Sequence, residues 1–162
     1  MNCSFIKKGI VSLLLFLLPL SILYGCTDAK VPTKNPSFDE IMGKISNTVD
    51  LSTLKEENFA KLKRLYGISR GEIEEFALYR APSNIKADEI VLIKVKQAED
   101  TDKVKEKILK RVEKQAANFK DYLPEEYYLI EKKVIKVQNN YLLLVVSPDA
   151  EKISEAFEQC FY

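Results

Sequence analysis

The chain has 162 residues, of which 25 are lysine or arginine and 24 are aspartate or glutamate, so its formal net charge is +1. This balance gives no global field that favours nucleic acid, and we expect no nucleic-acid partner. The absence of histidine excludes, on this chain alone, a Ser-His-Asp triad, a Cys-His pair and every histidine-based metal site.

The first residues have the pattern of a bacterial lipoprotein signal. Two lysines precede an apolar run over residues 10–23, and a small residue stands directly before Cys26. In such signals the peptide is cut before the cysteine, and the cysteine thiol carries a lipid with acyl chains such as palmitate. This lipid holds the protein on the membrane. We therefore predict a signal peptide over residues 1–25 and lipidation at Cys26.

Two other interpretations of this segment stay open. One is a plain secretory signal with an incidental cysteine, and the other is an uncleaved transmembrane helix. The apolar run is shorter than the roughly 20 residues that a spanning helix needs, and Pro19 interrupts it. Tyr24 is unusual for a lipoprotein signal, which normally has a small or β-branched residue two positions before the cysteine.

Residues 26–36 are polar, contain two prolines and show no periodicity, which predicts a tether ahead of a single domain over residues 37–162. Apolar residues at helical spacing predict a helix over residues 38–49. Thr53 and Glu56 form a capping-box pattern, which predicts a second helix from Leu54 to about Tyr66.

The middle of the chain predicts two strands and a long helix. Strands are expected over residues 75–80 and 89–96, with the turn residues 81–84 between them. A stripe of apolar residues predicts a helix from Thr101 to about Leu123, ended or kinked by the next proline. Its lysines fit a solvated face, although they could also meet anionic lipid or wall polymer.

The last part of the chain predicts a hairpin and a final helix. Strands over residues 133–138 and 141–146 flank the turn Asn139-Asn140, and the second strand is apolar throughout, as in a strand covered on both faces. Residues 127–130 fit either a helical turn or the start of a strand. Ser147 and Pro148 predict the N-terminus of a helix that buries Cys160.

Strand, strand and helix thus occur twice in succession. We predict an α+β fold, with a four-stranded, mainly antiparallel sheet built from two ββα-like units and preceded by two N-terminal helices. The repetition suggests internal duplication, or a coincidence of two common motifs.

The sequence shows few residues grouped in a pattern typical of catalysis or metal binding. Asp100-Thr101-Asp102 lacks the glycine and closing glutamate of a calcium loop, so helix capping is the better interpretation. Cys160 lies on an apolar helix stripe with no histidine to activate it. We expect no metal, no cofactor and no catalytic residue. The turn 81–84 is the loop most suited to a functional role, because loops between strands often carry function.

Several segments, in order and spacing, resemble a family of small lipoproteins from clostridia-like Gram-positive bacteria known as domain of unknown function 4358. They are the lipobox-like Cys26, residues 65–68, Ala81-Pro82 with 84–90, residues 122–124, and residues 147–153 before Phe157. The resemblance implies an extracytoplasmic lipoprotein without an established activity and offers no catalytic residues. It also implies a structural or binding signature at Pro82, Asn84, Ala87 and Glu89.

These observations favour a non-enzymatic module, anchored by lipid to the outer face of the cell membrane, that binds a protein, peptide or other envelope ligand. One alternative is a hydrolase or transferase that acts on envelope material through converging carboxylates, for which the candidates are Glu74, Glu75, Glu89, Glu125 and Glu126. Another is a purely structural spacer, which predicts no concave site.

Overall fold

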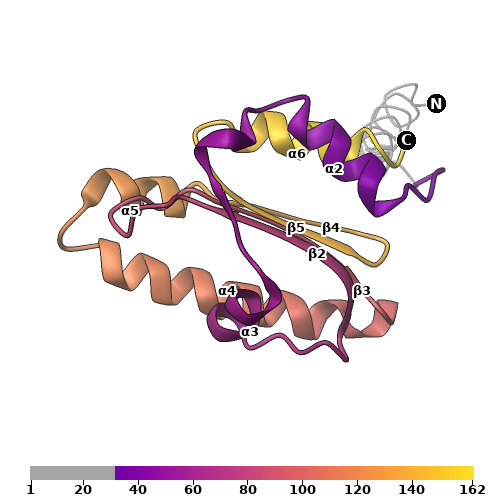
Figure 1. Ribbon diagram of the computed structural model, residues 1–162, viewed down its shortest axis with the longest axis horizontal. Helices are drawn as coiled ribbons and strands as arrows, with labels where there is room; N and C mark the ends of the chain where they lie inside the picture. Colours follow the sequence, from indigo (N-terminus) through magenta and orange to yellow (C-terminus); the bar gives the residue numbers. More distant parts are fainter. Residues whose placement is uncertain (1–31) are drawn as a thin grey trace, which may run out of the picture. The chain divides into compact units, whose positions relative to one another are not determined.

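The computed structural model describes residues 32–162 (Figure 1). The predicted signal peptide, Cys26 and most of the predicted tether lie outside the described residues. The described part forms one compact unit with a mixed α+β fold. No helix of residues 32–162 combines the length and apolar character needed to cross a membrane.

Five strands form one sheet in which all neighbours are antiparallel, in the order β1-β2-β3-β5-β4. The strands are β1 (Lys55–Glu56), β2 (Ile73–Arg80), β3 (Glu89–Val95), β4 (Val134–Gln138) and β5 (Tyr141–Val146). β3 and β5 lie at the centre, as expected for the most apolar strands. All six residues of β5 are buried, which confirms the prediction of a strand covered on both faces.

Helices cover both faces of the sheet (Figure 1). On one face lie α3 (Phe59–Tyr66), α4 (Thr101–Phe119) and Ile130 of α5 (Pro124–Glu131). On the other lie α2 (Phe38–Ser46) and α6 (Ala150–Glu158). Short 3-10 turns precede β1 and α4, at η1 (Leu51–Thr53) and η2 (Ala98–Asp100). The helices of the two ββα units, α4 and α6, therefore cover opposite faces.

Side chains that alternate in direction along the central strands divide the apolar core into two layers, one on each face of the sheet. Val91, Ile93 and Val95 of β3 pack toward α4, whereas Ile90 and Leu92 pack toward α2 and α6. Side chains of a strand point alternately to its two faces, so a single apolar strand supplies both layers. Of the stripe predicted for α4, Val104, Ile108, Val112 and Phe119 are buried and Ala116 is partly buried. The residues predicted to be buried by the last helix, which are Ile153, Ala156, Phe157, Cys160 and Phe161, are all buried, although Cys160 and Phe161 follow the end of α6.

The predicted helix start at Leu54 is wrong. Glu56 is not part of a capping box but pairs with Tyr79 in the short edge strand β1, and the backbone N–H of Glu57 donates to the carbonyl of Leu78 at 2.8 Å. The helix begins five residues later, at Phe59, and the side chain of the N-cap residue Asn58 accepts from the N–H of Lys61 at 3.1 Å. Sheet pairing therefore competes successfully with the local helix signal, and the four-stranded sheet of the prediction becomes five-stranded.

Other boundaries differ for local reasons. Pro124 does not kink the long helix. It is the first residue of α5, a position where its missing N–H costs nothing, so residues 127–130 are helical. The last helix begins at Ala150, because the Ser147 hydroxyl accepts from the N–H of Asp149 in a turn that precedes the helix. Asp100 precedes α4 without a side-chain capping bond.

The start and end of the described chain meet in the layer formed by α2 and α6. The backbone N–H groups of Thr33 and Lys34 both donate to the carbonyl of Phe161, at 2.9 and 3.1 Å. The buried hydroxyl of Tyr141 donates to the carbonyl of Pro36 at 2.9 Å. These bonds tie the segment before α2 to the C-terminal residues and to β5.

Candidate functional site

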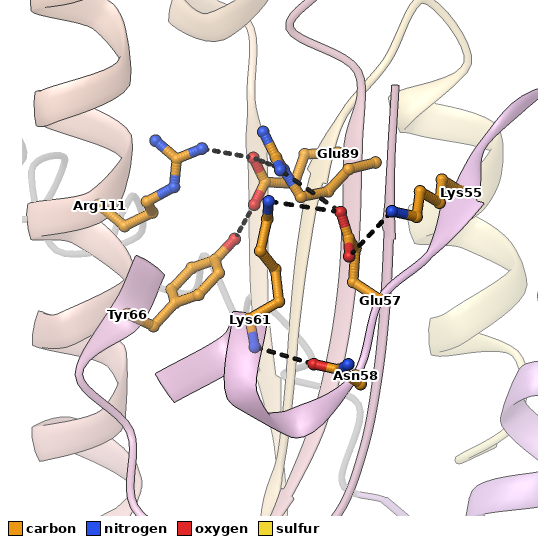
Figure 2. Close-up of polar contacts among 8 residues, drawn as sticks. Lys55, Glu57, Asn58, Lys61, Tyr66, Glu89 and Arg111 are labelled. Atoms are coloured by element: carbon orange, nitrogen blue, oxygen red, sulfur yellow. Dashed lines mark hydrogen bonds and ion pairs between the residues drawn. The ribbon is translucent and has the colours of Figure 1, made fainter. Parts of the chain in front are cut away.

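A buried carboxylate, Glu89, lies between the sheet and α4. One of its oxygens accepts a hydrogen bond from the hydroxyl of Tyr66, and the other accepts from Nη2 of Arg111 at 3.0 Å (Figure 2). Nε of Arg80 lies 3.6 Å from the same oxygen, which makes an ion pair without a hydrogen bond. Burial, together with the neighbouring Glu89 charge, raises the pKa of Tyr66 well above its usual value, so the phenol stays a donor.

The fold explains this grouping. Glu89 is the first residue of β3 and stands opposite Arg80, the last residue of β2. Tyr66 ends α3, and Arg111 projects from α4 beside the apolar stripe. A carboxylate with no exposed surface is tolerated because its oxygens are engaged by charged and phenolic donors.

A second carboxylate, Glu57, extends the network toward the edge of the sheet. Its oxygens lie 3.7 Å from both Lys61 Nζ and Arg80 Nη1, and 3.8 Å from Lys55 Nζ (Figure 2). Arg80 is therefore held between two glutamates, Glu57 and Glu89, and its guanidinium is fixed in place at the end of β2.

A cavity of about 360 Å³ opens over these arginines, which we term the basic cavity. Its cationic lining residues are Arg64, Arg80, Lys86, Arg111 and Lys114. Three amide side chains, Asn84, Gln115 and Asn118, and three apolar ones, Leu65, Phe119 and Leu123, complete it. No carboxylate lines this cavity in the part of the chain that the structure describes.

Three buried polar atoms of the basic cavity have no hydrogen-bond partner among residues 32–162. They are Nε of Arg80, Nε of Arg111 and Oε1 of Gln115. Arg111 and Gln115 are 9% and 4% exposed, so these atoms have little access to bulk water. Buried polar atoms normally find partners, and unpaired ones at a cavity wall indicate a place where a ligand supplies the missing bonds.

The structure brings three of the four residues of the expected signature near the basic cavity. Asn84 lines the cavity, and Glu89 forms ion pairs with two of its lining residues, Arg80 and Arg111. Ala87 is buried, donating its N–H to Glu126 at 2.8 Å and accepting at its carbonyl from Gln115 Nε2 at 3.2 Å. Pro82 is exposed in the turn after β2. A role of these four residues in binding stays a prediction.

Of the five candidate carboxylates of the alternative hydrolase, only Glu74 and Glu75 share an ion-pair partner. Glu74 and Glu75 both face Lys94, at 3.2 and 3.6 Å. Glu126 pairs with Lys86 at 2.6 Å, Glu89 is engaged as described, and Glu125 lines another hollow beside α5. Among the described residues, no group of three or more carboxylate or cysteine side chains is placed to hold a metal ion.

Two further features add no chemistry of this kind. A second hollow, of about 650 Å³, lies between α5 and the start of α6, and the exposed Tyr128 lines it. No unpaired buried atom of residues 32–162 belongs to its lining. Cys160 is buried, as predicted, and burial raises its pKa.

Sequence reasoning missed Arg80, Arg111 and Gln115. Arg111 and Gln115 stand four residues apart on α4, next to the apolar stripe, so both face the sheet together. That spacing was a usable signal, since polar residues flanking a buried stripe indicate a buried polar site. The pairing of Arg80 with Glu89 depends on the β2–β3 register, which no local pattern reveals.

The chain thus forms an α+β domain with helices on both faces of one sheet and with a concave, positively charged cavity. A family model described as domain of unknown function (DUF4358) matches residues 47–147, which is more than half of the chain. The chain belongs to this family. Searches among curated proteins and among solved structures found no match.

Proposed function

We propose that this protein is a membrane-anchored extracytoplasmic lipoprotein whose domain binds an envelope component through an anionic group. The observation that carries the binding role is the basic cavity. Within residues 32–162, buried arginine and glutamine atoms there lack hydrogen-bond partners, and the lining contains five cations and no carboxylate. Such a site supplies charge-assisted donors already held in place, so a ligand oxyanion replaces water without reorganising the protein.

The same cavity weighs against the two alternatives. A structural spacer needs no concave site, and an enzyme that uses two carboxylates needs two acids facing one cavity. The acids around the basic cavity are instead occupied in holding its cations. This arrangement favours binding over acid–base chemistry.

The second part of the proposal concerns the location of the protein in the cell. The pattern at residues 7–26 supports a lipid at Cys26, an outer-face location on the cell membrane, and a protein, peptide or other envelope ligand as partner. Intact mass of the membrane-extracted protein tests it. We expect a species that begins at Cys26 with added lipid mass and that disappears in Cys26→Ala; an unmodified product cut elsewhere would refute the anchor.

Binding is tested by titrating the full chain in detergent with sulfate, inorganic phosphate and acetate, using calorimetry. We expect at least one of these anions to bind and to be weakened by Lys114→Gln. Lys110→Gln is the matched control, because Lys110 is one turn away on the same helix, carries the same charge and does not line the cavity. Absence of binding by all three anions, or equal effects of the two variants, would contradict the proposal.

A further inference from the structure

The charges of the basic cavity define how negative its ligand should be. Three of the five lining cations are paired with three glutamates, and one of these, Glu57, is shared with Lys55 and Lys61, so at least two positive charges remain uncompensated. The paired groups are Arg80 with Glu57 and Glu89, Arg111 with Glu89, and Lys86 with Glu126. Within residues 32–162, the remaining two, Arg64 and Lys114, have no ion-pair partner.

A ligand with one carboxylate would neutralise at most half of this excess. A phosphate monoester carries about −1.5 to −2 charges at neutral pH and presents three acceptor oxygens on one group. Arginine side chains match such oxyanions with their fixed fork of donors, and Nε of Arg111 is a buried donor with no protein acceptor. Charge and geometry both favour the dianion.

Gln115 sets a second requirement for the ligand. Its Nε2 donates to the carbonyl of Ala87, which is able only to accept, so the amide orientation is set by that bond. Its Oε1 is therefore an acceptor, buried and without a partner at the cavity wall. An anion alone does not satisfy this atom. A ligand hydroxyl or N–H next to the anionic group does.

We propose that the basic cavity binds a phosphate monoester of a small polyol, with the phosphate at the arginine and lysine side chains and a hydroxyl donating to Oε1 of Gln115. The volume of about 360 Å³ is near the lower end of the roughly 300–1,000 Å³ typical of small-molecule sites. It leaves room beyond the phosphate for a short carbon chain against Leu65 and Phe119. This inference rests on the proposed function and names the ligand class for the same site.

The first test is a ligand series on the unmodified full chain, measured by calorimetry at pH 7.5. Glycerol 1-phosphate has the dianion and the hydroxyls, ethyl phosphate has only the dianion, and lactate has a hydroxyl with one charge. We expect glycerol 1-phosphate to bind about tenfold more tightly than lactate and several-fold more tightly than ethyl phosphate. Malate, with its two charges on separate carboxylates, should bind less tightly than glycerol 1-phosphate.

The second test uses variants. Gln115→Met should remove the advantage of glycerol 1-phosphate over ethyl phosphate, because methionine has no amide oxygen to accept from the ligand hydroxyl. Lys114→Gln should weaken both phosphates, whereas Lys110→Gln should weaken neither.

The outcomes separate the two proposals. If none of the four ligands binds, the basic cavity is not an anion site and the proposed function fails with it. If anions bind but lactate equals glycerol 1-phosphate, malate exceeds it, or ethyl phosphate equals it, the site is real and the polyol phosphate is wrong. An unchanged preference in Gln115→Met would also overturn the assignment of the hydroxyl.

Discussion

Arg111 donates from Nη2 to Oε2 of Glu89 over 3.0 Å, and the two side chains are 8% and 0% exposed. The pair joins α4 to the first residue of β3 beneath the basic cavity. A buried charge that loses its partner keeps its full desolvation cost. Breaking this contact therefore costs much more free energy than breaking a surface ion pair.

Glu89→Ala should therefore destabilise the protein by about 3–5 kcal/mol, since it leaves Arg111 buried without its anion. Urea unfolding measures the change. Glu113→Gln provides the control, because Glu113 is exposed on the same helix and should change stability by less than about 0.5 kcal/mol. A loss below about 1 kcal/mol for Glu89→Ala would mean that the pair does not hold α4 to the sheet.

Glu72 should make the protein sensitive to acid. Burial acts to raise its pKa, but hydrogen bonds from Lys107 and Ser69 outweigh that effect and lower the pKa from 4.5 to about 2. A depressed folded-state pKa contributes stability that is fully present above pH 4.5 and is lost as the pH falls through about 2.

The matching variant is Glu72→Gln, which should cost about 1–2 kcal/mol at pH 7, the range for hydrogen bonds to a charged group. Denaturant unfolding at pH 7 and at pH 2.5 tests this. The difference in the free energy of unfolding between wild type and Glu72→Gln should be smaller at the lower pH. For Glu155→Gln, at an exposed position of α6, this difference should not change with pH. A difference between wild type and Glu72→Gln that stays constant with pH would contradict the role of the Glu72 carboxylate.

Gly67 and Gly43 should respond to alanine in opposite directions. Gly67 is the C-cap residue after α3 and lies in the left-handed region, with φ of 66°, where a side chain is strained. Gly43 lies inside α2, and an added methyl group there meets no atom within 4 Å among the described residues. Gly67→Ala should therefore lower stability by about 1 kcal/mol and Gly43→Ala should raise it by about 0.5–1 kcal/mol, by thermal unfolding. Equal effects would mean that the two positions do not differ in backbone conformation.

Cys160 should be slow to react with thiol reagents. Its side chain is buried, its Sγ lies 3.3 Å from the carbonyl of Ala156, and burial raises its pKa, so little thiolate is available. In a chain with Cys3 and Cys26 replaced by serine, modification at pH 8 should be at least about tenfold slower in the folded protein than in urea. Similar rates in both states would show that α6 opens readily.

Periodicity accounts for most of the fold. The apolar run of β5 and the stripes of α4 and α6 predicted their burial, because side-chain spacing alone decides which face meets the core. The start of α3 was wrong because a strand pairing, Glu56 with Tyr79, competed with the local capping pattern. A long-range bond of this kind leaves no trace in the residues around Thr53.

The basic cavity was only partly predictable. The turn after β2 and the stretch from Asn84 to Glu89 stood out in the sequence, and the structure places Asn84 at the cavity. The arginines did not stand out, because Arg80 and Arg111 meet only through the register of β2 and β3 and the packing of α4 on the sheet.

The bonds between Thr33, Lys34 and Phe161 have a mechanical consequence. Any pull on the N-terminal end of the domain is carried first by these backbone bonds and by the bond from Tyr141 to Pro36, in the layer of α2 and α6. The basic cavity is lined by residues of α3, α4, the end of β2 and the turn after it. The helices α3 and α4 lie on the other face of the sheet from α2 and α6 (Figure 1). A pulling force at this end would therefore act on one face of the sheet, whereas a ligand in the basic cavity would contact helices on the other face.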